Sequence, residues 1–231
     1  MVTETKKFDP KALVNAGMNR ALESQRPLAS ENVARLRRVH PDKSPAELIS
    51  YINKVYLAAV TGTGAAAGAS AVVPNLVLQI PVTIAELLTF LEASVLYTLS
   101  VAEVHKLDVA DVERRRFLVT SVLLGNSAAT SALEPIIGRS VPYWGKKIVE
   151  SIPMAAIDKA NKVLGPRFIT KYGTRQGVLV LGKQIPLAIG IGVGAAGNHV
   201  FGRFVVKAAK EILGPPPESW DEEENLTLRD L

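Results

Sequence analysis

Two glycine-containing patterns in the C-terminal half could bind the phosphates of a nucleotide. Gly192, Gly194 and Gly197 have the spacing of a dinucleotide-binding turn, but that turn works only inside a strand–helix–strand unit. The residues after Gly197 are too few to complete a parallel sheet. The stretch 177–183 is similar to a P-loop, yet Gln184 stands where Ser or Thr would hold magnesium. We therefore expect no nucleotide cofactor.

A His-Pro-Asp sequence at His40-Pro41-Asp42 resembles the loop of J-domain co-chaperones. Such a loop lies between two paired helices, and the helix expected before it, over 31–39, is about half the required length. Two interpretations stay open. The sequence is either a J-like interaction loop or a proline turn before a capped helix.

Residues for nucleophilic or metal chemistry are scarce. The chain has no cysteine, and its three histidines, His40, His105 and His199, are 65 and 94 residues apart. Thiol enzymes, zinc ribbons and iron–sulfur centres are excluded, and no local ligand spacing or G-x-S-x-G elbow occurs. We expect no catalytic residues, no metal and no cofactor. A hydrolase assembled from dispersed residues is the weaker alternative.

Two acidic residues lie in apolar surroundings. Glu86 and Glu92 are six positions apart, which places them on different faces of one helix and argues against a paired-carboxylate site. Glu86 follows a long uncharged run. For both residues the pattern indicates a charge on the polar face of an amphipathic helix, and for Glu86 the alternative is a partly buried charge paired with Lys183 or an arginine.

Charge is unevenly distributed along the 231 residues, whose formal net charge is +5. Six acidic residues and one basic residue give 214–231 a net charge of −5, which leaves +10 on 1–213. Such a body attracts polyanions. Aromatic residues do not alternate with the basic clusters, so we expect no specific nucleic-acid partner. The predicted contacts with an anionic surface are Arg114, Arg115, Arg116, Lys146 and Lys147.

Helix signals dominate the chain. We expect helices from Pro10 to about Glu23 and over 31–39, a helix capped by Ser44 that buries Leu48, Ile52, Val55 and Ala59, a long helix beginning at Pro81, and short helices joined by turns over 126–173.

Two uncharged blocks account for the apolar character of the chain, which is 48% apolar and only 21% charged. The first covers 55–85, and the second lies between Lys183 and Arg203. Small residues one turn apart let helix backbones approach closely, as in membrane helix pairs. A series counted by fours begins at Gly182, just before the second block, and runs to Gly202. The predicted helix-packing seam consists of Gly64, Gly68, Gly190, Gly194, Asn198 and Gly202.

Four segments together resemble the EcsC family. They are TGTGAAAGASAVVPN, IPVTIAELLTFLEASVLYTLSVAEV, LDVADVERRRFLVTSVLLG and IPLAIGIGVGAAGNHVFGRFVVKAAKEI. The resemblance covers about 50–212, although His105-Lys106-Leu107 replaces the tyrosine–glycine pair expected at the turn. It implies an all-helical, membrane-associated protein, and it supplies no active site.

These observations predict an all-α domain of about seven or eight helices, with two central Gly/Ala-rich helices near 55–73 and 185–212. We expect an N-terminal helical extension over 1–45, an EcsC-like domain over 46–213 and a disordered acidic tail over 214–231. Because the first residues are charged, we expect no secretory signal there. The expected function is non-enzymatic association with lipid or an anionic membrane surface on the cytoplasmic side, with a membrane protein as a possible further partner. The alternative is a soluble protein-interaction module.

Overall fold

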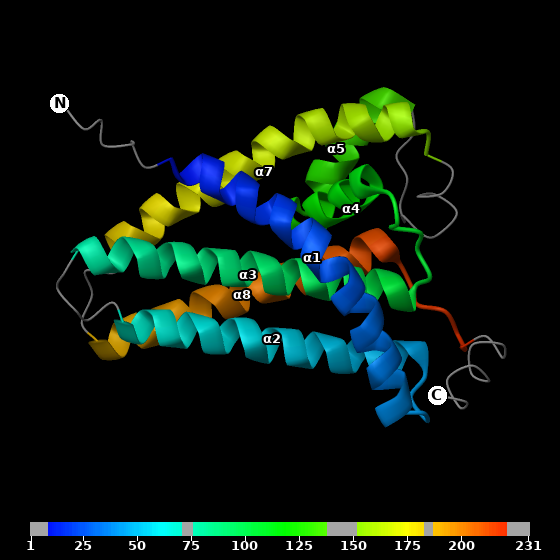
Figure 1. Ribbon diagram of the computed structural model, residues 1–231, viewed down its shortest axis with the longest axis horizontal. Helices are drawn as coiled ribbons and strands as arrows, with labels where there is room; N and C mark the ends of the chain where they lie inside the picture. The colour runs from blue at the N-terminus through cyan, green and yellow to red at the C-terminus, as the bar shows by residue number, and fades with distance from the viewer. Residues whose placement is uncertain (1–8, 71–75, 138–151, 183–186, 221–231) are drawn as a thin grey trace.

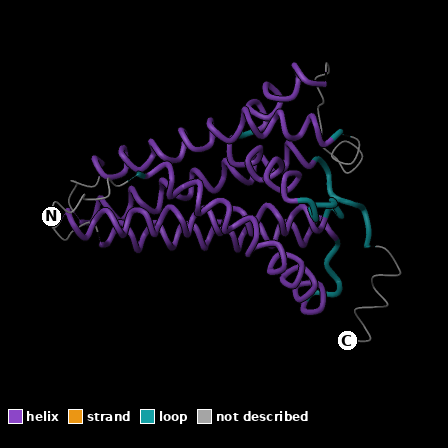
Figure 2. The backbone as a smooth tube through the Cα atoms, turned by 45° about the horizontal axis from the view of Figure 1, so that its top comes forward, coloured by secondary structure: helices purple, strands orange, loops and turns teal. Residues whose placement is uncertain are grey.

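The computed structural model describes residues 9–70, 76–137, 152–182 and 187–220, which contain helices and no strand. The fold class is therefore all-α, as predicted. Most of the described loop residues gather at one end of the molecule (Figure 2). The helices are α1 (Pro10–Val39), α2 (Pro45–Ser70), α3 (Leu76–Val104), α4 (Val112–Leu124), α5 (Asn126–Ile137), α7 (Met154–Gly182) and α8 (Leu187–Leu213) (Figure 1).

Local capping explains where several helices begin. The Asp9 carboxylate accepts a hydrogen bond from the Lys11 amide at 2.9 Å at the start of α1. Before α2, the Glu47 carboxylate accepts from the Ser44 amide at 2.9 Å, and the Ser44 hydroxyl accepts from the Glu47 amide at 3.3 Å. This reciprocal pair satisfies donors that a helix start leaves unpaired. The capped start expected at Ser44 is confirmed.

Two helices are longer than the sequence suggested. The chain from Pro10 to Val39 is one helix that includes Pro27, not two helices with a break. Likewise, α7 continues through Pro166, where short helices were expected. Both prolines are exposed, so the carbonyl that each leaves without its amide partner lies on the water-facing side.

The third helix is the centre of the fold. It contacts α1, α2, α4, α7 and α8, and it begins at Leu76 rather than at Pro81. The two Gly/Ala-rich helices α2 and α8 instead lie along each other to one side of α3. Fully buried side chains from four helices pack around this centre, including Leu22 of α1, Phe90 and Leu91 of α3, Leu118 of α4, and Leu164 and Tyr172 of α7.

The buried face of α2 differs from the expected one. Leu48 and Ile52 are buried, but Tyr56 and Val60 continue this face, whereas Val55 is 50% exposed. Ala59 is exposed as well. The reason is that α1 does not pack along α2 after their connecting turn but crosses α3 instead, which leaves one side of α2 uncovered (Figure 1).

The first part of the expected disordered tail has a defined position. The Trp220 indole N–H donates to the Lys43 carbonyl at 2.8 Å. The Arg37 guanidinium carbon lies 4.2 Å from the centroid of the same indole ring. Residues 214–220 therefore return to the α1–α2 turn and its basic residue Arg37. The rest of the tail lies outside the described residues.

Candidate functional site

The structure places two residues of the predicted helix-packing seam. A Cβ atom added at Gly202 would lie 2.9 Å from Val60 Cγ2, so α8 approaches α2 closely there. Asn198 is buried, and its side-chain amide donates to Glu86 Oε1 at 3.2 Å. Gly182 ends α7, so the series counted from it does not lie on one helix. The surroundings of Gly64, Gly68, Gly190 and Gly194 lie outside what the structure describes.

Glu86 is partly buried on α3. Its carboxylate accepts the hydrogen bond from Asn198, which joins α3 to α8 at the seam. Lys183 lies outside the described residues, so the predicted Glu86–Lys183 pair stays a prediction. The contact with Asn198 was not foreseen, because nothing local links residues so far apart in sequence.

The predicted basic cluster at the start of α4 does not form one surface. Arg115 is only 6% exposed, and its guanidinium donates to the Val109 carbonyl at 3.2 Å. The expectation that Arg115 contacts an anionic surface is therefore wrong. Arg114 and Arg116 are partly buried, and Arg116 Nε lies 3.4 Å from the Glu113 carboxylate. Lys146 and Lys147 lie outside the described residues.

A different basic surface lies on the C-terminal half of α8. Val200, Arg203, Phe204, Lys207 and Lys210 follow the spacing of one helical face, and all five are exposed. We call this set the α8 face. Its valine is 64% exposed and its phenylalanine 37%, which places apolar groups in water between three cations. The spacing was visible in the sequence, but this helix was expected to lie inside the fold.

Contacts with neighbouring elements hold the α8 face in place. Lys171 Nζ of α7 lies 4.3 Å from the centroid of the Phe204 ring and donates to the Leu123 carbonyl at the end of α4, at 3.0 Å. Gly125, with φ of 101°, lies beneath the same ring, since an added Cβ would be 2.7 Å from Phe204 Cζ. The aromatic ring thus packs against Lys171 of α7 and against Gly125 at the end of α4.

One helix of the described chain, over Ala85–Val104, is long and apolar enough to cross a membrane. However, 67% of that window is buried among the other helices. A helix in the core of a soluble protein can be as long and as apolar as one that spans a membrane. The apolar content of α3 is explained by its central position.

The His40 turn differs from a J-domain loop in its surroundings. The helix before it is long enough, because α1 has 30 residues. However, α1 and α2 do not pack along each other. In a J-domain the two helices that flank the loop are paired. The His40 ring lies 5.0 Å from the Tyr51 ring, and Trp220 binds the carbonyl of Lys43. The geometry favours the second interpretation, a proline turn before a capped helix.

The described residues do not assemble a polar catalytic cleft. Glu86 lies in the first half of α3 and His105 directly follows the end of that helix, so at 1.5 Å per residue the two are about 28 Å apart. The Thr61 hydroxyl lies 3.1 Å from Nδ1 of His199, so this ring nitrogen already has a hydrogen-bond partner. Nor does any group of three or more His, Asp or Glu side chains in these ranges have a metal-binding arrangement.

Comparisons with family models, curated proteins and solved structures find no match to this chain. The resemblance to the EcsC family accordingly stays a prediction. The geometry of the described surface is what supports a function.

Proposed function

We propose that the protein is a non-enzymatic, peripheral membrane protein whose α8 face binds anionic lipid surfaces. The observation that carries this proposal is the exposure of Val200 and Phe204 between Arg203, Lys207 and Lys210. A helix that lies in a membrane interface inserts apolar side chains at the acyl boundary and places cations among the headgroups. The α8 face has both components on one side of a helix.

The charge of the whole chain supports the same partner. Residues 1–213 have a formal net charge of +10, which attracts an anionic surface over about a Debye length. Lys207 is 76% exposed and its only described ion pair is with Glu211 at 3.7 Å. Exposed pairs of this kind contribute little, so a headgroup phosphate can compete for the ammonium.

Sedimentation with vesicles tests the proposal. The full chain is mixed with vesicles of phosphatidylcholine alone or with about one third phosphatidylglycerol, at low and at physiological salt. We expect binding only to the anionic vesicles, weakened by salt. Replacing Arg203, Lys207 and Lys210 by glutamine should weaken binding by roughly 100-fold, since each basic group near such a surface contributes about 1 kcal/mol.

A matched triple variant separates the α8 face from general attraction by the basic body. Lys159, Lys162 and Arg167 are exposed on α7, and their replacement by glutamine removes the same charge. The proposal predicts a clearly smaller loss for the α7 variant. Equal losses, or equal binding to neutral vesicles, would contradict it. Absence of vesicle binding at low salt would favour the soluble interaction module instead.

A further inference from the structure

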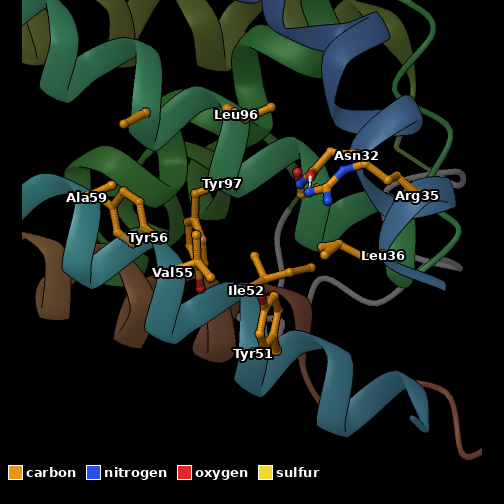
Figure 3. A pocket seen from close by; sticks show the side chains of 12 residues that line it. Asn32, Arg35, Leu36, Tyr51, Ile52, Val55, Tyr56, Ala59, Leu96 and Tyr97 are labelled. Carbon is orange, nitrogen blue, oxygen red and sulfur yellow. Dashed lines mark hydrogen bonds between the residues drawn. The ribbon is translucent and has the colours of Figure 1, made fainter. Parts of the chain in front are cut away.

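The uncovered side of α2 borders a cavity that the α8 face does not use. This cavity has a volume of about 160 Å³ and lies between α1, α2 and α3 (Figure 3). The cavity exists because α1 packs across α3 and not along α2. Val55 and Ala59 are therefore not covered by α1 and stay exposed. Leu57, which borders the α8 face, points to the other side of α2 from Val55.

Two stacked tyrosines form an apolar wall of the cavity. The rings of Tyr56 and Tyr97 are 4.4 Å apart between centroids, with an angle of 22° between their planes. The Tyr56 hydroxyl lies 2.8 Å from Ser94 Oγ, and the Tyr97 hydroxyl donates to Asn53 Oδ1 at 2.7 Å. Because both hydroxyls are already engaged, the two rings present mainly carbon to the cavity. Burial also raises the pKa of Tyr97, which keeps its hydroxyl neutral.

The polar groups of the cavity are few and are either neutral or cationic. Ser100 is 1% exposed, and its hydroxyl has no hydrogen-bond partner within the described chain. Because this hydroxyl has almost no accessible surface, it adds no polar group to the cavity wall. Arg35 is exposed at the α1 side, where its guanidinium donates to Asn32 Oδ1 at 3.0 Å and keeps further donors available. No acidic side chain is among the described residues that line the cavity.

We infer that this cavity binds a small amphipathic carboxylate, with an apolar body of about six to eight carbons against Tyr56, Tyr97 and Val55. The carboxylate accepts hydrogen bonds from Arg35. The size follows from the volume, since a cavity of about 150 Å³ accommodates benzene. The charge follows from the guanidinium, which pairs with planar carboxylates through two parallel donors.

Titration calorimetry on the full chain tests the inference with four probes. Octanoate and phenylacetate carry the carboxylate on a chain or a ring, and octanol and 2-phenylethanol are their neutral counterparts. We expect saturable binding of at least one carboxylate, with its alcohol weaker by about tenfold. The preferred member of the pair identifies the apolar body as a chain or as a ring.

Two variants locate the binding and assign the charge. Val55→Trp fills the cavity from a half-exposed position, so the fold should be retained while carboxylate and alcohol both lose at least tenfold. Arg35→Gln should weaken the carboxylate by about tenfold and leave the alcohol unchanged. Val163→Trp and Arg20→Gln are the matched controls, on exposed positions of α7 and α1 away from the cavity.

The inference is overturned if no probe binds saturably to the wild-type chain, or if Val55→Trp leaves binding intact. It is also overturned if Arg35→Gln weakens alcohol and carboxylate equally. Thermal unfolding of each variant shows whether its fold is retained. If Val55→Trp fails to fold, competition between octanoate and octanol on wild type and Arg35→Gln still decides the result. Vesicle binding by the α8 face is a separate measurement on the other side of α2, so either proposal can fail alone.

Discussion

Gly202 and Gly197 lie on the same helix and differ in what faces them. At Gly202 an added Cβ would be 2.9 Å from Val60 Cγ2 and 3.0 Å from Leu57 Cδ2, whereas at Gly197 no atom lies within 4 Å. Gly202→Leu should lower the free energy of unfolding by about 2–3 kcal/mol through overpacking. Gly197→Ala should raise it by about 0.5–1 kcal/mol through helix propensity. Urea unfolding measures both, and shifts of the same sign would contradict the described α2–α8 contact.

His105 gives the turn after α3 a defined pH dependence. Burial lowers the pKa of His105 from its ordinary 6.5 to about 4. The unfolded chain therefore binds this proton first, and the stability contributed by the neutral imidazole is present above pH 6.5 and is lost as the pH falls towards 4. We expect the urea midpoint of the wild-type chain to decrease over this range.

A variant isolates this contribution from the titrating carboxylates. His105→Gln keeps a polar side chain of similar size and removes the titration, so its midpoint should decrease less between pH 7 and pH 4. Identical pH profiles for the two proteins would show that the imidazole is solvated in the folded state.

At the level of elements, the segment after α8 closes over the turn between α1 and α2. Trp220 makes two contacts there, the hydrogen bond to the Lys43 carbonyl and the stacking on the Arg37 guanidinium. A cation over an indole face and one hydrogen bond each contribute about 1 kcal/mol. Trp220→Ala should therefore lower stability by about 1–2 kcal/mol and increase amide exchange over 40–44.

Trp220→Phe is the matched control, because it keeps a ring for Arg37 and loses only the indole N–H. It should show an intermediate effect. Unchanged exchange at the turn in Trp220→Ala would mean that residues 214–220 do not cover it in solution.

Over the whole molecule, α2 separates two surfaces of different chemistry. The α8 face combines exposed cations with Val200 and Phe204, and the cavity on the other side of α2 combines apolar walls with Arg35. We propose that both bind anionic amphiphiles: the α8 face binds a lipid surface, and the cavity binds a small carboxylate. This arrangement depends on α1 crossing α3 instead of covering α2.

The sequence by itself determined the helical class, the capped start at Ser44 and the length of the C-terminal helix near 185–212. These features depend on local spacing and on hydrogen bonds between residues three or four apart. The absence of cysteine and the division of charge between body and tail were also visible there. So was the spacing of the α8 face, although not its exposure.

Only the tertiary structure decided which faces are covered. In the structure, α1 continues through Pro27 and α7 continues through Pro166. Arg115 is buried, whereas Val55 and Ala59 are exposed. The physical reason is that helix periodicity states which residues share a face, while burial depends on which distant helix packs against that face. The helices that pack against α2 are α8 and α3, and not α1, which precedes α2 in the chain. The side of α2 that α1 leaves uncovered borders the cavity.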